Sequence, residues 1–138
     1  MKVEIYTDGG SFGNPGPSAY GFVIQSDKKE ILYEEGQTIG HATNNIAEYT
    51  ALIRAFEKVL ELIGKKELVV REIAVYADSQ LMIQQIKGHY KVKKPHIREL
   101  FDEVYRLIPR LNVPINYTHI PREQNTRADS LVKRALGR

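Results

Sequence analysis

Four short stretches of this chain carry a carboxylate beside small polar residues: YTDGGSFGNPG, TNNIAEY, YADSQ and HIPREQNTRADSL. They single out Asp8, Glu48, Asp78 and Asp129. Carboxylate oxygens are the ligands that Mg²⁺ and Mn²⁺ prefer in proteins. Two such ions about 4 Å apart can activate a water and stabilise the leaving oxygen of a phosphodiester. If folding brings the four side chains together, they predict metal-dependent phosphodiester hydrolysis.

All four carboxylates also have an ordinary structural explanation, which is simplest for Asp8, Asp78 and Asp129. Asp8 precedes Gly9 and fits a turn. Asp78 follows a strand-like segment and could cap the next helix. Asp129 comes three residues after Thr126, which fits a capping box or a favourable charge at a helix N-terminus. Each explanation suffices for its own residue, so only the group as a whole points to a metal site.

Glu48 is the carboxylate that fits its structural alternative least well. It follows Asn45 by three residues, which is the spacing of a capping box. It is also in helical phase with the apolar residues Leu52, Phe56 and Val59, so it shares the stripe that should be buried. A buried carboxylate is costly unless it is paired or bound to metal. Divalent cations would also remove the repulsion within a carboxylate group.

The pattern of apolar and turn-forming residues predicts the elements that position these side chains. The first helix can be capped by Asn44 or Asn45 and can end at Gly64. Three strands joined by short connections suggest an antiparallel meander, and the later alternation of strands and helices implies parallel pairing. We expect a mixed five-stranded sheet covered by helices. The expected strands are 2–8, 19–26, 30–38, 71–77 and 113–120, and the expected helices are 45–63, 79–87, 96–108 and 126–136.

This arrangement places two of the carboxylates side by side. Asp8 and Asp78 would end neighbouring parallel strands, and ligands of open α/β sheets bind outside such strand ends. Glu48 and Asp129 would come from the first turns of helices that face the same crevice.

Composition narrows the class of protein. The chain has 138 residues, of which 42% are hydrophobic, and this suits one soluble domain with its own core. It has no cysteine, which excludes disulfides and thiolate metal sites. We see no bilayer-spanning run and no signal peptide, so we expect a cytoplasmic protein without membrane contact. The net charge of +3 permits a polyanionic partner without requiring one.

Taken together, the four stretches resemble type 1 ribonuclease H, and the resemblance spans nearly the whole chain. It implies an α/β, ribonuclease H-like fold with a mixed five-stranded sheet in the order 3-2-1-4-5, flanked by helices on both faces. It implies one domain over residues 1–138, without a separate hybrid-binding domain. The implied activity is endonucleolytic hydrolysis of the RNA strand of RNA–DNA hybrids by a monomer. Two Mg²⁺ ions, with Mn²⁺ as a possible substitute, would be held by the catalytic residues Asp8, Glu48, Asp78 and Asp129.

The resemblance also implies a set of contacts to the hybrid. Asparagine and glutamine side chains suit the 2′-hydroxyl of RNA, because both partners donate and accept hydrogen bonds. Small residues in the first loop would allow the backbone to approach, and a threonine would contact a phosphate of the DNA strand. Turn and capping chemistry is the alternative for the asparagines and glycine. The residues are Ser11, Gly13, Asn14, Thr43, Asn44, Asn45 and Gln80.

His119 has two interpretations. It lies ten residues before Asp129, the spacing at which the family often has a histidine that moves protons or helps products leave. The family's loop is rich in glycine, whereas this chain has THIPREQN, so His119 could instead end the last strand. In that case Arg122 or Glu123 could take part of its role. We expect the other histidines to be surface residues without metal-ligand spacing: His41, His89 and His96.

The connection GHYKVKKP carries a basic cluster of Lys87, Lys91, Lys93 and Lys94 around Tyr90. One interpretation is a short handle on the phosphates of the DNA strand, which would make affinity fall with salt. The alternative is a solvated charged segment.

Two other functions compete with the ribonuclease. A hybrid- or RNA-binding module would keep the fold without turnover, although the four carboxylates speak against it. Another nuclease of the same superfamily, such as an exonuclease or resolvase, would share the metal site. The stretches TNN and SFGNPG favour the ribonuclease, because the family uses them to recognise the hybrid.

Overall fold

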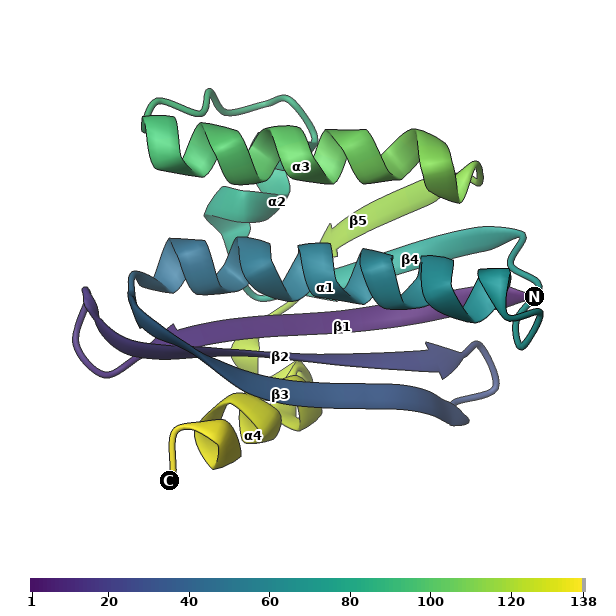
Figure 1. The fold of residues 1–138 in the computed structure, drawn as a ribbon, viewed down its shortest axis with the longest axis horizontal. Helices are drawn as coiled ribbons and strands as arrows, with labels where there is room; N and C mark the ends of the chain where they lie inside the picture. The colour runs from purple at the N-terminus through teal and green to yellow at the C-terminus, as the bar shows by residue number, and fades with distance from the viewer. Residues whose placement is uncertain (138) are drawn as a thin grey trace.

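Five strands form one mixed sheet in the order β3-β2-β1-β4-β5, with helices on both of its faces (Figure 1). The coordinates are a computed structural model that describes residues 1–137. The strands are β1 (Lys2–Ser11), β2 (Gly16–Ser26), β3 (Ile31–Ala42), β4 (Glu72–Ala77) and β5 (Ile115–His119). The helices are α1 (Asn44–Gly64), α2 (Gln80–Ile86), α3 (Pro95–Leu111) and α4 (Thr126–Ala135), with a 3₁₀ turn, η1 (Arg122–Gln124), before α4.

The sheet changes from antiparallel to parallel at β1. This strand pairs antiparallel with β2, and β2 pairs antiparallel with β3. On its other side β1 pairs parallel with β4, and β4 pairs parallel with β5. The expected strand order and the division into a meander and a parallel half are confirmed. Because β1 and β4 run in the same direction, the residues that follow their last mutual pair, Asp8 and Asp78, lie at the same end of the two strands.

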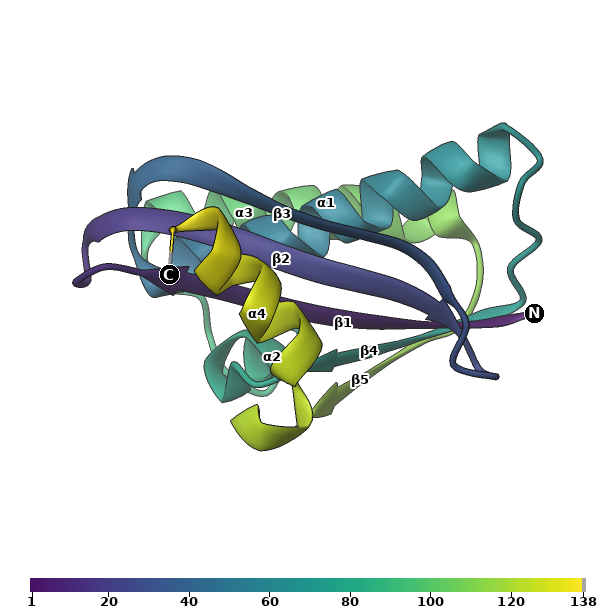
Figure 2. The ribbon, with the colours of Figure 1, turned by 90° about the horizontal axis from the view of Figure 1, so that it is seen from below.

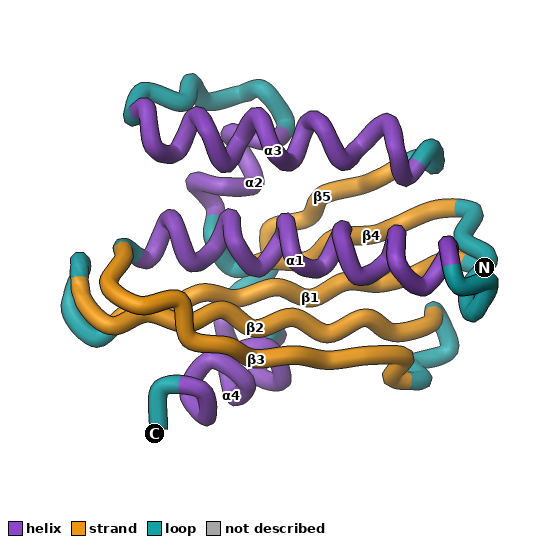
Figure 3. Tube along the Cα trace, in the orientation of Figure 1, coloured by secondary structure: helices purple, strands orange, loops and turns teal. Residues whose placement is uncertain are grey.

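The helices form two layers of unequal size. Helices α1 and α3 lie side by side over one face of the sheet, and α4 lies on the opposite face (Figures 1 and 2). The main core lies between α1 and the sheet, where Ile5, Val75, Leu52 and Phe56 are fully buried. The tube in Figure 3 shows that α1 follows the direction of the central strands along most of their length. This long contact fixes α1, and therefore Glu48, relative to β1.

The first hairpin is longer than the sequence predicts. The glycine-rich run after Asp8 was expected to be a loop, but β1 continues to Ser11 and β2 begins at Gly16. The pairs Gly9–Tyr20 and Ser11–Ser18 extend the ladder through this run. Cross-strand pairing therefore overrides the local turn preference, and β3 is likewise extended to Ala42 by pairing with β2.

The caps of three helices differ from the expected ones. Thr43 caps α1, because its side chain accepts a hydrogen bond from the backbone N–H of Ile46, so neither Asn44 nor Asn45 is the cap. Ser79 caps α2 in the same way, in place of Asp78. The capping boxes considered for Glu48 and Asp129 are not formed. Three carboxylates are therefore left without the capping role that their position in the sequence suggested.

The remaining elements lie close to their expected ranges. Helix α3 runs past Pro109 to Leu111, beyond the expected end at residue 108, because Leu111 is buried in the core. The turn η1 was not expected. Within residues 1–137, no helix combines the length and the apolar character needed to span a bilayer.

Candidate active site

Asp8 lies on the central strand and not in a turn. It pairs with Gly21 of β2, and only 6% of its surface is exposed. The parallel pairing of β1 with β4 ends one residue earlier, at Thr7 and Ala77. Asp8 therefore stands where the two strands part, at the edge of the sheet where a ligand can enter.

Glu48 is brought to Asp8 by a close approach of helix α1 to strand β1. A Cβ atom at Gly9 would come within 2.3 Å of the backbone of Ala47 and 2.4 Å of the nitrogen of Glu48. Only glycine has no Cβ, so only glycine permits this contact. Glu48 is 7% exposed, as its phase with the buried stripe predicted.

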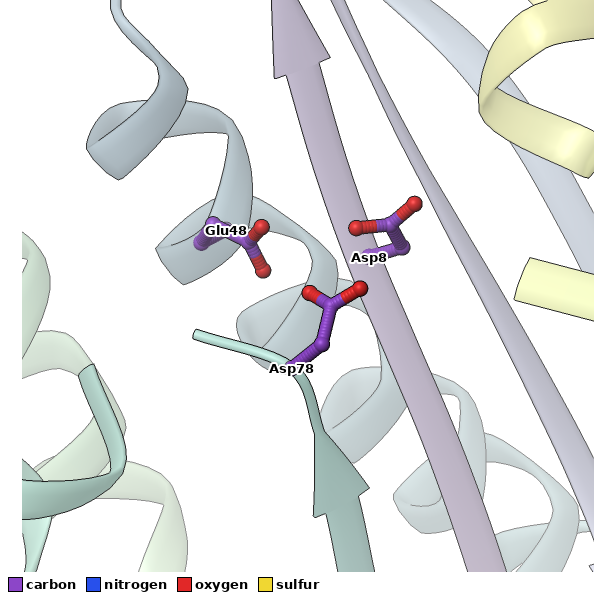
Figure 4. Close-up of side chains that lie close together, drawn as sticks. All are labelled: Asp8, Glu48 and Asp78. Carbon is purple, nitrogen blue, oxygen red and sulfur yellow. The ribbon is translucent and has the colours of Figure 1, made fainter. Parts of the chain in front are cut away.

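Asp78 completes a group of three carboxylates. It directly follows β4 and precedes the capping residue of α2. One oxygen from each of Asp8, Glu48 and Asp78 lies within 4.8 Å of the other two. Figure 4 shows the three side chains pointing toward one another from β1, from α1 and from the end of β4.

Asp129 approaches the same place from the opposite face of the sheet. Helix α4 packs against two glycines of the sheet, since a Cβ at Gly21 or Gly36 would collide with the Leu131 region. The Asp129 carboxylate interacts with Asp8 but is not part of the group of three mutually close carboxylates. Its Oδ2 lies 2.9 Å from Nζ of Lys133, one helical turn further along.

Burial and mutual repulsion make these carboxyl groups hard to ionise without a counter-charge. Burial, followed by the charges of Asp78 and Asp129, raises the pKa of Asp8 to about 8. Burial, followed by the charges of Asp8 and Asp78, raises the pKa of Glu48 well above its ordinary value. The backbone N–H of Gly9 donates to both carboxylates and partly offsets the shifts. The site therefore favours a cation.

The donor set fits a divalent metal ion. Oε2 of Glu48 and Oδ2 of Asp78 are buried and have no hydrogen-bond partner among the described residues. Buried polar atoms normally find a partner, so two such oxygens in one group of three carboxylates mark a site for a bound group. Ligands made only of oxygen suit Mg²⁺ or Mn²⁺.

The carboxylates line a cleft of about 790 Å³ that also takes in much of the predicted hybrid-binding set. Gly13 lies at the exposed tip of the first hairpin, and Gln80 is exposed at the start of α2. Neither belongs to the cleft lining, although Ser79 and Leu81, beside Gln80, do. The predicted residues that line the cleft are Ser11, Asn14, Thr43, Asn44 and Asn45.

Three polar side chains at this end of the cleft differ in their hydrogen bonding. The backbone N–H of Asn44 donates to Oδ1 of Asn14 at 2.9 Å, which joins the hairpin tip to the start of α1. Oδ1 of Asn45 is a buried acceptor without a partner among the described residues. The Oγ1 atom of Thr43 accepts the capping hydrogen bond, which leaves its hydroxyl hydrogen to donate elsewhere.

His119 lies at the end of the last strand, as the structural interpretation of this residue predicted. It is the exposed last residue of β5 and pairs with Ala77, and it does not line the cleft. Arg122, in the turn η1, does line it. His96 is exposed, as expected, but also faces the cleft.

Sequence reasoning assigned no role to some of the residues in the cleft. Lys133 could have been found, because it lies one helical turn after Asp129. The position of His96 depends on how α3 packs on α1, and no local pattern carries that information.

The basic cluster borders a second hollow of about 570 Å³. Lys91, Lys93 and Lys94 line it together with Tyr90, whereas Lys87 does not. This hollow shares residues with the carboxylate cleft, so the two are continuous. The shared residues are Asn45, Leu81, Lys94 and Ile97.

Comparison with known proteins decides the family. A family model described as "Reverse transcriptase-like" matches residues 6–135. The ribonuclease H of Dechloromonas aromatica is 33% identical, and the match covers 97% of this chain and 93% of that protein. The chain belongs to the ribonuclease H family. This ribonuclease H chain is also 43% identical to LC11-RNase H1, which was solved in complex with an RNA/DNA hybrid. That match has a TM-score of 0.90 and covers 98% of this chain and 96% of the solved one.

Some relatives of this ribonuclease H chain are much longer. A bifunctional protein of Mycobacterium tuberculosis is 42% identical over 137 residues, which is 99% of this chain but 36% of that protein. The chain thus spans about a third of the length of the mycobacterial relatives that it matches.

Proposed function

We propose that this ribonuclease H chain is a metal-dependent endonuclease that hydrolyses the RNA strand of RNA–DNA hybrids, and that residues 1–138 form its single catalytic domain. The observation that carries the proposal is the convergence of Asp8, Glu48 and Asp78, with two buried oxygens that lack partners among the described residues. A structural carboxylate group would instead be paired with cations or capping N–H groups.

We assign all four carboxylates as ligands of a pair of Mg²⁺ ions, with Mn²⁺ as a substitute. Asp8 would contribute to holding both ions, because it interacts with Asp78, Asp129 and Glu48. Bound divalent ions would supply an activated water and charge stabilisation at the scissile phosphate. Asp8, Glu48 and Asp129 are held on β1, α1 and α4, and Asp78 directly follows β4. The carboxylates therefore need to move little when the substrate binds.

The amide-lined end of the cleft supports recognition of the hybrid. The buried Oδ1 of Asn45, which has no partner within residues 1–137, can accept a hydrogen bond from a ribose 2′-hydroxyl or a base edge. Asn14 uses Oδ1 to hold Asn44, so its NH₂ group remains the donor toward a ligand. We propose that Ser11 and Thr43 contact the same substrate, and that Gly13 and Gln80 join only where the hybrid extends beyond the cleft.

We propose His119 for the shuttle role, because its side chain is exposed and it pairs with Ala77, the residue before Asp78. Arg122 or Glu123 is the alternative for part of that role. Arg122 lines the cleft as a permanent positive charge that would assist departure of the anionic product, and the exposed carboxyl group of Glu123 can carry a proton. We also propose that the protein acts as a monomer in the cytoplasm, and the absence of cysteine is compatible with a reducing compartment.

The decisive experiment is a cleavage assay with a labelled RNA–DNA hybrid, an all-DNA duplex and Mg²⁺. The proposal expects cuts in the RNA strand of the hybrid only, and none after Asp8→Asn. Binding without cleavage by the wild-type protein would favour a hybrid-binding module, and comparable cleavage of the DNA duplex would favour another nuclease. Wild-type rates in Asp8→Asn would refute the assigned site.

A further inference from the structure

Asn125 stands at the N-cap position of α4, yet its side chain does not cap the helix. An asparagine at this position usually accepts a hydrogen bond from a backbone N–H of the first turn. Here the side chain points into the protein instead, and only 1% of Asn125 is exposed. Capping therefore does not explain why an amide is buried at this place.

The Asn125 side chain instead binds strand β1 next to the metal site. Its Nδ2 donates to the carbonyl oxygen of Thr7 at 2.8 Å. Thr7 directly precedes Asp8, and it is the last residue of β1 that pairs with β4. The amide thus binds at the point where the two strands part, at the residue before Asp8.

The backbone of Asn125 completes the connection to the fourth carboxylate. Its carbonyl oxygen accepts a hydrogen bond from the backbone N–H of Asp129 at 3.1 Å. Its own N–H donates to the carbonyl of Arg122 at 2.9 Å, which closes the turn η1. One residue therefore joins the strand that carries Asp8 to the helical turn that carries Asp129.

This connection opposes a repulsive force. The Asp8 and Asp129 carboxylates belong to two separate elements and line the same cleft. Like charges on two separate elements push those elements apart when no cation lies between them. The packing of Ala128 and Leu131 against Gly21 and Gly36 holds α4 on β2 and β3, whereas the Asn125 amide ties the start of α4 to β1, the strand that carries Asp8.

We infer that Asn125 is a positioning residue of the metal site, whose side-chain amide sets the separation of Asp8 and Asp129. The inference rests on the proposed function in taking these two carboxylates as metal ligands. Asn125 itself touches neither metal nor substrate, and it acts through Asp129. A neutral donor is required, because a carboxylate would add repulsion and a carbon side chain would leave the Thr7 carbonyl without its partner.

A double-mutant cycle on metal affinity tests this inference. The proteins are wild type, Asn125→Leu, Asp129→Ala and the double variant, each titrated with Mg²⁺ by calorimetry at a temperature where all are folded. We expect Asn125→Leu to weaken binding by about tenfold or more, which is typical for residues that orient metal ligands. In the Asp129→Ala background the same substitution should change the affinity by less than about twofold, because the residue through which it acts is gone.

The control is Arg127→Met, which removes the ion pair that joins the same helix to Glu34 of β3 and keeps the amide. Neither Arg127 nor Glu34 lines the carboxylate cleft, so this variant should leave Mg²⁺ affinity unchanged. The inference is overturned if Asn125→Leu binds Mg²⁺ like wild type, if the two losses simply multiply in the double variant, or if Arg127→Met weakens binding equally. Should Asn125→Leu not fold, Asn125→Ser takes its place, and failure of both to fold would assign Asn125 a purely structural role. The titrations contain no hybrid, so a wild-type protein that binds Mg²⁺ but cuts nothing would count against the proposed function alone.

Discussion

The backbone nitrogen of Glu48 lies only 2.4 Å from the place where a Cβ of Gly9 would be. Helix α1 and strand β1 therefore touch through a position that tolerates no side chain, and this contact sets the distance between Glu48 and the neighbouring Asp8. The contact involves backbone atoms of α1, which cannot move aside as a flexible side chain can.

Gly9→Ala should push α1 away from β1 and separate the carboxylates. We expect a loss of about 1–3 kcal/mol in the free energy of unfolding, as for other overpacked sites, together with weaker Mg²⁺ binding. Chemical denaturation and calorimetry measure the two effects. Gly64→Ala at the end of α1 is the control, because nothing lies within 4 Å of its Cβ position, and it should be neutral or stabilising. A Gly9→Ala protein as stable as wild type would show that the close approach does not constrain the fold.

The metal-free protein should lose stability as the pH rises. Burial, with Asp78 and Asp129 next, raises the pKa of Asp8 from 3.8 to about 8, and burial also raises that of Glu48. The folded state therefore holds more protons than the unfolded state between about pH 4 and about pH 8, and stability falls as the pH rises through this window. Thermal unfolding in a chelator measures the slope.

Two comparisons isolate the cause of that slope. Asp8→Asn removes one of the shifted groups, so its melting temperature should fall less steeply with pH and exceed that of wild type near pH 8. Saturating Mg²⁺ should stabilise wild type most at the high end of the window, where the carboxylates are ionised. A metal-free melting temperature that rises across the window would mean that these carboxyl groups are not protonated in the folded protein.

Lys133 should compete with metal for Asp129. Its Nζ lies 2.9 Å from the carboxylate, and it lines the cleft. An exposed ion pair of this kind is worth roughly 0.2–1 kcal/mol, so Lys133→Met should tighten Mg²⁺ binding by up to about fivefold. Calorimetric titration measures the change, with Arg134→Met on the same helix as the control. Weaker binding by Lys133→Met would mean that the lysine supports the site instead of competing for it.

The affinity for the hybrid should fall as the salt concentration rises, because lysines line the second hollow beside the cleft. Each lysine that contacts a phosphate contributes about 0.7–0.9 to the slope of log affinity against log salt concentration. Lys93→Ala, measured by fluorescence anisotropy in the Asp8→Asn background, should reduce the slope by that amount. Lys28→Ala is the matched control, because the turn between β2 and β3 lies beside the N-terminal end of β1, away from Asp8. Equal slopes for Lys93→Ala and wild type would identify the cluster as a solvated segment.

Much of this protein could be predicted from local patterns. Segments rich in apolar and β-branched residues between turn-forming runs, and the helical phase of Leu52, Phe56 and Val59, predicted the order of the elements, because both depend on residue types and spacing alone. The same phase indicated that Glu48 is buried. The four carboxylates were evident from their neighbours, and the family resemblance supplied the strand order, which is confirmed.

Errors arose where long-range contacts outweighed local preference. The glycine-rich hairpin is paired through Ser11 because β2 lies beside it. Thr43 caps α1 in place of Asn44 or Asn45, and Ser79 caps α2, so Asp78 does not have the capping role of its structural alternative. A helix begins where its packing against the sheet allows, and several adjacent polar residues can cap it equally well.

The sequence by itself determined which side chains are available for metal chemistry and which elements carry them, because both follow from residue types and their spacing. Only the tertiary structure decided which of these side chains meet. The approach of α1 at Gly9 and the tether from Asn125 to Thr7 set the geometry of the site. Both join segments far apart in the chain, and their distances depend on how whole elements pack.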